Sequence, residues 1–260
     1  MSDANVKNLA EFGPAVEVTN QHGGGRVVLA CEHASAFVPP FLNGLGLDKE
    51  AAVSHAAWDI GALDVAKGLA ERLDAPLVAG RLSRLVYDCN RPPDAPDAIP
   101  ARSEIFEVPG NRDLSDADRL LRVTHVYRPF HETLAAVIAE RPNPTVLVTM
   151  HSFTPVYNGK SREVELGLLH GKDDRLARSM LVHTGQTGWL SALNQPYGPK
   201  DGVLHTLDRH AEPAGLLNVM IELRNDLLLT PEDIQGAIER ISAVLNVALD
   251  DIGMSQEADA

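Results

Sequence analysis

This sequence has few cysteines and fewer basic than acidic residues, and both features exclude several classes of protein. Cys31 and Cys89 are the only two cysteines among 260 residues, too few for a disulfide-stabilised scaffold. The formal net charge is −13, whereas a surface that binds nucleic acid or an anionic membrane needs clustered lysine and arginine. We therefore expect neither a nucleic-acid partner nor a membrane partner. A basic pocket inside an acidic protein can still bind a small anionic substrate.

Long apolar segments are also missing. No run approaches the roughly 18 apolar residues of a membrane span, and residues 1–13 lack the apolar centre of a secretion signal. Hydrophobic residues nevertheless make up 44% of the chain, which is enough for a substantial core. These features predict a cytoplasmic globular protein, with an irregular N-terminal arm at 1–25, a single domain at 26–253 and a short tail at 254–260.

Short apolar runs alternate with amphipathic segments along the chain. Short apolar runs bounded by glycine, proline or polar residues are typical of buried strands, and they occur at 26–31, 76–79, 84–88, 145–150, 164–169 and 216–221. Helical spacing of apolar residues predicts helices at 48–53, 58–73, 115–140, 174–186 and from 231 onward. This alternation predicts an α/β fold: a single domain with a mostly parallel central sheet flanked by helices.

Capping and breaking residues refine these boundaries. Ser115 and Thr230, each followed by acidic residues, are typical of helix N-termini. Pro129 lacks a backbone N–H and predicts a break within the third helix. Residues 94–110 are too polar and too rich in proline for a core element, and we expect a long loop over the functional site there. Residues 189–205 are also predicted to be loop.

Metal-capable or acidic side chains follow three of the apolar runs. His33, His151 and Glu222 each stand at or just beyond the C-terminal end of a run. Ligands of open α/β sheets bind at the carboxyl ends of the strands, and histidine is a common protein ligand of zinc. The alternative is that each histidine caps or hydrogen-bonds a neighbouring loop. The shared strand-end position favours a metal site, although the spacing of the two histidines is weak evidence by itself.

A catalytic zinc site needs about three protein ligands, so a carboxylate is expected to complete the set. Asp59 is the best candidate, although an aspartate near the start of a helix is also favoured by the helix dipole. Glu32 is the alternative. It adjoins His33, and neighbours on a strand point to opposite faces, so only a loop conformation would let both bind one ion.

Glu222 emerges from a run of apolar residues, where an unpaired charge is costly. It is therefore either paired or catalytic. Arg224, two residues further on, is the possible partner on the same face of a strand. As a catalytic residue, Glu222 would be a general base that takes a proton from water and passes it to a leaving amine.

Arginine side chains suggest how a carboxylate-bearing substrate would be held. Asn90 and Arg91 follow a predicted strand, and the planar guanidinium fork suits a carboxylate. Arg84 and Arg162 are further candidates. A surface salt bridge is the alternative for each arginine, and it is the interpretation we favour for Arg162.

Four segments together resemble the N-formylglutamate amidohydrolase family. They are Cys31–Ser35, Ser83–Pro92, His151–Pro155 and Ile221–Asp226. Their order and separation make the resemblance fairly specific, and they span about residues 26 to 228. The family is similar in fold to zinc carboxypeptidases and to the succinylglutamate desuccinylase and aspartoacylase group.

The resemblance implies a zinc site at His33 and His151, a carboxylate-binding pair at Asn90 and Arg91, and Glu222 as base. The wider group often has the motif H-x-x-E, but Ala36 stands three residues after His33, so the second ligand must come from elsewhere. We choose Asp59.

The expected activity is hydrolysis of an N-acyl amino acid amide with one zinc ion. The first substrate to consider is N-formyl-L-glutamate. The alternatives are another N-acyl amino acid, a small peptide, or a non-catalytic binding protein that kept the scaffold.

Overall fold

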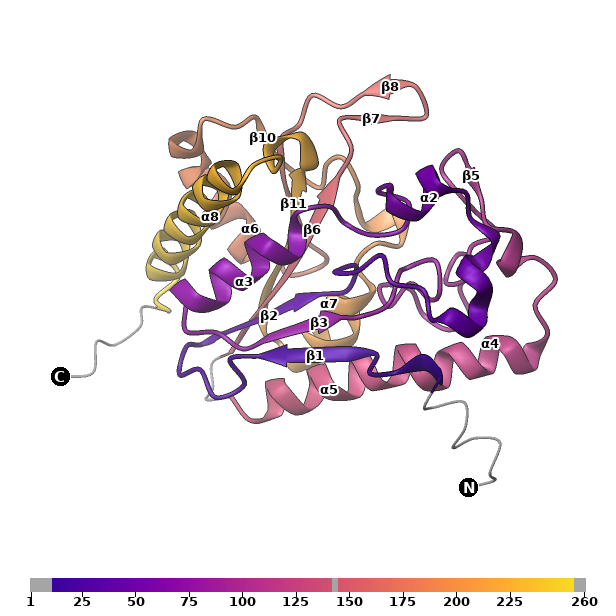
Figure 1. The fold of residues 1–260 in the computed structure, drawn as a ribbon. Helices are drawn as coiled ribbons and strands as arrows, with labels where there is room; N and C mark the ends of the chain where they lie inside the picture. The colour runs from indigo at the N-terminus through magenta and orange to yellow at the C-terminus, as the bar shows by residue number, and fades with distance from the viewer. Residues whose placement is uncertain (1–10, 142–144, 255–260) are drawn as a thin grey trace.

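A seven-stranded sheet forms the centre of the computed structural model, which describes residues 11–141 and 145–254 (Figure 1). The strand order is β1-β3-β2-β6-β11-β9-β10. The strands are β1 (Val16–Thr19), β2 (Val27–Cys31), β3 (Leu77–Gly80), β6 (Val146–Phe153), β9 (Leu166–Leu169), β10 (Ser191–Leu193) and β11 (Leu217–Arg224). Four neighbouring pairs are parallel: β3–β2, β2–β6, β6–β11 and β9–β10. The pairs β1–β3 and β11–β9 are antiparallel. The expected α/β fold with a mostly parallel sheet is confirmed.

Helices cover both faces of this sheet. The helices of one face are α3 (Ala62–Arg72), α6 (Arg175–His183) and α8 (Pro231–Asp251), and those of the other are α5 (Arg128–Ala139) and α7 (His205–His210) (Figure 1). Side chains alternate between the two layers: Val148 and Met150 of β6 pack toward α3 and α8, and Leu147 packs toward α5. No helix within 11–141 and 145–254 is both long and apolar enough to cross a membrane.

Shorter elements connect these layers. Two are helices, α2 (Lys49–Val53) and α4 (Asp116–Arg122), and four are strands of two hairpins: β4 (Arg102–Ser103), β5 (Phe106–Glu107), β7 (Val156–Tyr157) and β8 (Lys160–Ser161). Short 3-10 turns occupy Pro40–Gly46, Pro109–Asn111, Thr184–Thr187, Pro199–Asp201, Glu212–Ala214 and Asn225–Leu227. The predicted loop over 94–110 therefore contains the β4–β5 hairpin.

The helix starts predicted at Ser115 and Thr230 and the break predicted at Pro129 are confirmed. The hydroxyl groups of Ser115 and Thr230 accept hydrogen bonds from backbone N–H groups three residues on, and capping boxes form at both sites. At Pro129 the chain does not simply kink. A π-helical turn (Val123–Tyr127) separates α4 from α5, and the Arg128 N–H reaches back to the Val123 carbonyl. The wider turn accommodates the missing N–H of proline at the start of α5.

Four sequence-based boundaries are wrong. β1 lies within the predicted irregular arm, where it pairs with β3 at the sheet edge. β10 lies within the predicted loop 189–205. Residues 84–88 form a turn in which the Val86 N–H donates to the Ser83 carbonyl; a short buried apolar run does not reveal whether it is a strand. Helix α3 begins at Ala62 instead of 58. The arm and tail predicted for 1–10 and 255–260 lie outside the described residues.

Candidate active site

The candidate site lies at the carboxyl ends of β2, β6 and β11, where ligands of open α/β sheets bind. His33 follows β2 by two residues. His151 and Glu222 lie inside β6 and β11, because both strands continue past their predicted ends to Phe153 and Arg224. They are paired residues in the parallel register, so two candidate functional groups are fixed side by side by the sheet itself.

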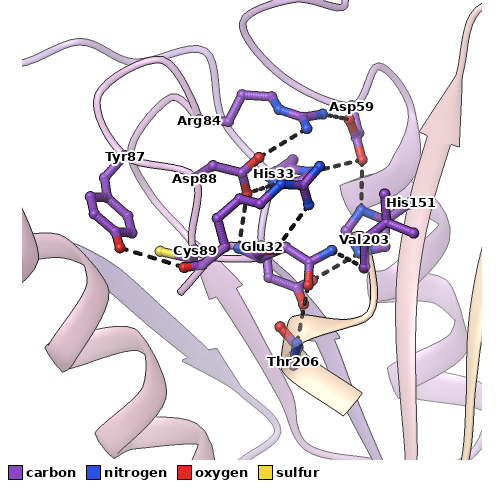
Figure 2. Close-up of polar contacts among 12 residues, drawn as sticks. Glu32, His33, Asp59, Arg84, Tyr87, Asp88, Cys89, His151, Val203 and Thr206 are labelled. Atoms are coloured by element: carbon purple, nitrogen blue, oxygen red, sulfur yellow. Dashed lines mark hydrogen bonds and ion pairs between the residues drawn. The ribbon is translucent and has the colours of Figure 1, made fainter. Parts of the chain in front are cut away.

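Asp59 is brought to the two histidines by the turn before α3. Its backbone N–H donates to the His33 carbonyl at 2.9 Å, which ties the two segments together. Its Oδ2 lies 3.2 Å from His33 Nδ1 and 2.9 Å from His151 Nδ1 (Figure 2). Gly61 is the N-cap of α3, so Asp59 lies outside the helix and its carboxylate faces the histidines. The three side chains predicted to hold the metal therefore converge, and all are buried.

Each of these histidines has a second carboxylate on its other ring nitrogen. His33 Nε2 lies 2.7 Å from Asp88 Oδ1, a hydrogen bond. His151 Nε2 lies 3.1 Å from Glu32 Oε2, but the angle does not meet hydrogen-bond geometry. Glu32 follows β2 in a turn, which is the loop conformation that its own candidacy required. It reaches the far side of His151, away from Asp59.

This arrangement fits a bound cation. A neutral imidazole that donates from Nε2 carries a lone pair on Nδ1. Without a metal, the surrounding carboxylates outweigh burial and raise the pKa of both His33 and His151, so an Nδ1 proton can bridge each ring to Asp59. In the neutral form with the proton on Nε2, both rings would turn an Nδ1 lone pair toward the Asp59 carboxylate, which is a donor set for a cation. The ligand atoms of this set all lie within 4.8 Å of one another. Two nitrogens and one oxygen suit zinc, and outer carboxylates commonly orient ligand histidines.

Arg84 joins the inner and outer carboxylates. Its Nη1 lies 3.2 Å from Asp59 Oδ1, and its Nη2 lies 3.0 Å from Asp88 Oδ2 (Figure 2). Burial alone would raise the pKa of Asp88, but the charges of His33 and Arg84 outweigh burial and hold it well below its usual range. The pKa of Asp59 is likewise held low, against burial, by His33 and His151. Both carboxylates are therefore ionised. The predicted role of Arg84 in substrate binding stays a prediction.

Glu222 does not pair with Arg224, the partner considered from the sequence. Arg224 pairs with Asp226 at 2.8 Å and with Glu165 at 3.2 Å, so the expected alternative of a Glu222–Arg224 pair is wrong. Glu222 is 5% exposed, and among the described residues its Oε2 has no hydrogen-bond partner. Burial raises the pKa of Glu222 to about 7. A carboxyl group in that state can exchange a proton near neutral pH.

Comparison with known proteins identifies the family. The model of the N-formylglutamate amidohydrolase family matches residues 25–229. The chain belongs to this family. The expected class, a hydrolytic enzyme acting on amide bonds, is thereby confirmed, as is the family resemblance. No curated protein matches the sequence.

Two solved structures share the fold of this chain. A gene product of Agrobacterium tumefaciens is 47% identical, with a TM-score of 0.90 over 97% of this chain and 99% of that one. The N-formylglutamate amidohydrolase of Ralstonia eutropha is 16% identical, with a TM-score of 0.70 over 91% of this chain and 97% of that one. The second likeness shows a common fold.

All seven site residues predicted from the sequence line one cavity of the amidohydrolase, of about 140 Å³. Asn90 and Arg91 hold its wall together. The Asn90 side chain donates to the Val203 carbonyl at 2.5 Å and accepts from the Thr206 N–H at 3.1 Å. Arg91 donates to the Gly202 carbonyl and to Asp97. Both residues thus join the turn after β3 to the start of α7, besides facing the cavity.

Several lining residues were not predicted. They include His55, Ser103, Glu104, Tyr157 and Tyr197. Two hairpins meet above the cavity, where the Asn158 N–H donates to Glu104 Oε1 at 3.4 Å. The first hairpin lies within residues 94–110, which were predicted to cover the site. No motif in the sequence indicated that Tyr157 and Tyr197 would line the cavity. Asp88 was also missed, although it lies within the segment that carries the family resemblance.

Proposed function

We propose that this amidohydrolase uses one zinc ion to hydrolyse the amide bond of an N-acyl amino acid, with N-formyl-L-glutamate as the first substrate to test. The observation that carries the proposal is the convergence of His33 Nδ1 and His151 Nδ1 on Asp59, beside a buried Glu222 whose Oε2 has no hydrogen-bond partner among the described residues. A binding protein that only kept the scaffold has no need of a poised proton acceptor at that position. The family match supports the same chemistry.

His33, His151 and Asp59 would hold the zinc. A zinc ion there supplies Lewis acidity, which polarises an amide carbonyl and makes water more acidic. The other steps belong to the chain. Glu222 accepts a proton from the attacking water and delivers it to the leaving nitrogen, a role for which a pKa near neutrality is well matched. Its place opposite His151 on the neighbouring strand fixes the proton acceptor beside a residue that would hold the zinc.

Asn90 and Arg91 orient the substrate through its carboxylate. Arg91 lines the cavity, and its bonds to Asp97 and Gly202 engage Nε and Nη1. The guanidinium is thus held in one orientation before substrate arrives. Binding the carboxylate at a fixed position raises the effective concentration of the amide at the catalytic centre.

A hydrolysis screen of the purified, zinc-loaded protein tests the proposal. The panel contains N-formyl, N-acetyl and N-succinyl amino acids and small peptides, and the release of free amine is measured beside zinc-free protein and Glu222→Gln. We expect zinc-dependent hydrolysis of N-formyl amino acids that Glu222→Gln loses. Failure to hydrolyse any member would refute the proposed function and favour a non-catalytic binding protein.

A further inference from the structure

A second pocket, of about 660 Å³, lies beside the catalytic cavity. It is lined by the β7–β8 hairpin, by the residues that follow this hairpin, and by β10 at the edge of the sheet. Tyr157 lines both the pocket and the cavity. Tyr197 of the cavity accepts a hydrogen bond at 2.9 Å from Arg162 of the pocket. The pocket and the cavity therefore share a wall.

Aromatic rings hold Arg162 in this wall. Its guanidinium carbon is 4.5 Å from the centre of the Tyr157 ring, 4.7 Å from that of Tyr197 and 5.5 Å from that of Phe153. Its Nη1 donates to the Thr154 carbonyl at 3.4 Å, besides the bond from Nη2 to Tyr197. A guanidinium has five N–H groups. The remaining groups of Arg162 can therefore donate to a ligand without loss of these contacts.

The pocket carries an excess of positive charge. No carboxylate of the described residues forms an ion pair with Arg162, so the surface salt bridge that the sequence favoured is wrong. Lys160, exposed on β8, also forms no ion pair within this part of the chain. Arg84 and Arg91 of the cavity, by contrast, are bound by carboxylates. Glu163 is the one acidic residue that lines the pocket, against these two cations. Cation–π contacts are weaker than ion pairs, so the pocket suits an anion.

The order of the strands places this pocket away from the proposed carboxylate clamp. Along the sheet the order is β3-β2-β6-β11-β9-β10. Arg91 belongs to the segment that follows β3, His151 and Glu222 lie in β6 and β11, and the pocket lies at β10. A substrate with its α-carboxylate on Arg91 and its amide beside His151 and Glu222 therefore extends its acyl group toward the pocket.

We propose that this pocket is an acyl subsite, in which Arg162 and Lys160 bind an anion at the far end of the acyl group of the substrate. The inference rests on the proposed function and adds the chemical class of the acyl group, a carbon chain that ends in a carboxylate. Val164, Leu190 and Pro196 also line the pocket and would pack against the chain. A formyl group has no chain and leaves the pocket unused.

Two substrates that differ only at the end of the acyl group test this assignment. N-glutaryl-L-glutamate ends in a carboxylate, and N-(4-carbamoylbutanoyl)-L-glutamate has an uncharged amide of the same size there. The reacting bond is the same in both, so the ratio of their kcat/KM values measures the contact at the far end. The unaltered enzyme should prefer the acid about tenfold, as expected for one hydrogen bond between charged groups. Arg162→Gln should remove most of this preference.

Two further variants complete the test. Lys160→Gln replaces an exposed side chain, so it should fold, and it should lower the preference about twofold, as expected for an exposed ion pair. Arg240→Gln is the matched control. Arg240 is exposed on α8 with its guanidinium carbon 5.0 Å from the Trp189 ring centre, so this variant removes a cation and an aromatic contact that belong to neither the cavity nor the pocket. It should leave the preference unchanged.

Equal turnover of the acid and the amide by the unaltered enzyme would overturn the proposal. So would an unchanged preference in folded Arg162→Gln, or in Lys160→Gln should Arg162→Gln not fold.

Binding without turnover separates this inference from the proposed function. Calorimetry of the zinc-loaded Glu222→Gln variant, which keeps the pocket, measures its affinity for both compounds. If the unaltered protein hydrolyses no N-acyl amino acid, but this variant binds the acid more tightly and a second substitution, Arg162→Gln, removes the difference, the proposed function fails and the subsite stands. If hydrolysis occurs but neither turnover nor binding depends on Arg162 or Lys160, the subsite fails and the proposed function stands.

Discussion

Glu222 and His151 are direct partners in the parallel pairing of β11 with β6. One is the candidate proton acceptor and the other a candidate zinc ligand, and both side chains are buried on the same face of the sheet. Their separation cannot change without breaking the hydrogen bonds between two central strands. A site that depends on proton transfer over a short distance gains from this rigidity, because catalytic groups on strands are held more closely than groups on loops.

The first prediction is that Glu222→Gln loses turnover without losing the fold. Glutamine keeps the size of the side chain but cannot accept a proton from water. General-base catalysis contributes about a hundredfold to ten-thousandfold, so kcat per folded, zinc-loaded molecule should fall by at least that order. Zinc affinity and melting temperature should change little, because no ion pair of Glu222 is lost.

Glu165→Gln is the control for this prediction. Glu165 pairs with Arg224 at 3.2 Å near the same strand, so its replacement removes an ion pair but no proposed chemistry. Its turnover should be retained. Normal turnover with a lowered melting temperature in Glu222→Gln would instead assign Glu222 a structural role.

The second prediction concerns the acid behind His33. Asp88→Asn removes the charged acceptor that orients the ring through Nε2, and zinc affinity should fall about ten- to a hundredfold. Competition with a chelating dye measures this directly. Asp173→Asn is the control, since Asp173 pairs with the exposed Arg175 and not with His33 or His151. Unchanged zinc affinity in Asp88→Asn would mean that Asp88 serves mainly to hold Arg84.

Local signals predicted much of this fold and the centre of the site. Apolar runs revealed the strands that carry His33, His151 and Glu222, because burial and strand length can be recognised within a few residues. Thr230 revealed the start of α8 for a similar reason, since a capping box is made of neighbours in the chain. Each of these inferences used interactions between residues close in sequence.

Long-range contacts account for what could not be predicted. The contact of Asp88 with His33 could not be predicted, because the two residues are 55 positions apart in the sequence. The turn at 84–88 brings Asp88 to His33 only once β3 has paired with β2. The same holds for Arg162, which contacts the aromatic rings of Phe153, Tyr157 and Tyr197 from three separate positions in the sequence. A sequence shows that an arginine needs a partner, but not which one.

The third prediction concerns the carboxylate clamp. Arg91→Lys should raise KM for an N-acyl amino acid about tenfold and leave kcat nearly unchanged, because an ammonium group cannot reproduce the planar fork. Steady-state kinetics on the best substrate of the screen measure both constants. Arg175→Lys, at an exposed ion pair with Asp173, should change neither. If KM for Arg91→Lys equals that of the unaltered enzyme, Arg91 does not hold the substrate.

The last prediction concerns His131, which couples the stability of the protein to pH. His131 joins α5 to α7: its Nε2 donates to the Cys89 carbonyl at 2.9 Å, and its Nδ1 lies 2.8 Å from His210 Nε2. The side chain is 1% exposed, and burial, assisted by the neighbouring histidines, lowers its pKa from the ordinary 6.5 to about 3.

Between pH 6.5 and pH 3, His131 is therefore protonated in the unfolded chain but neutral in the folded protein. The contribution of the neutral ring to the free energy of unfolding is fully present above pH 6.5, and it is lost as the pH falls toward 3. At pH 5 this amounts to about 2 kcal/mol. Urea unfolding at pH 7.5 and pH 5 should thus show that His131→Gln loses about 2 kcal/mol less than the unaltered protein. Contributions from other groups, including Glu222, cancel in this comparison. His22→Gln, at an exposed position, should lose as much as the unaltered protein. An equal loss in His131→Gln would show that His131 is not the residue through which acid destabilises the fold.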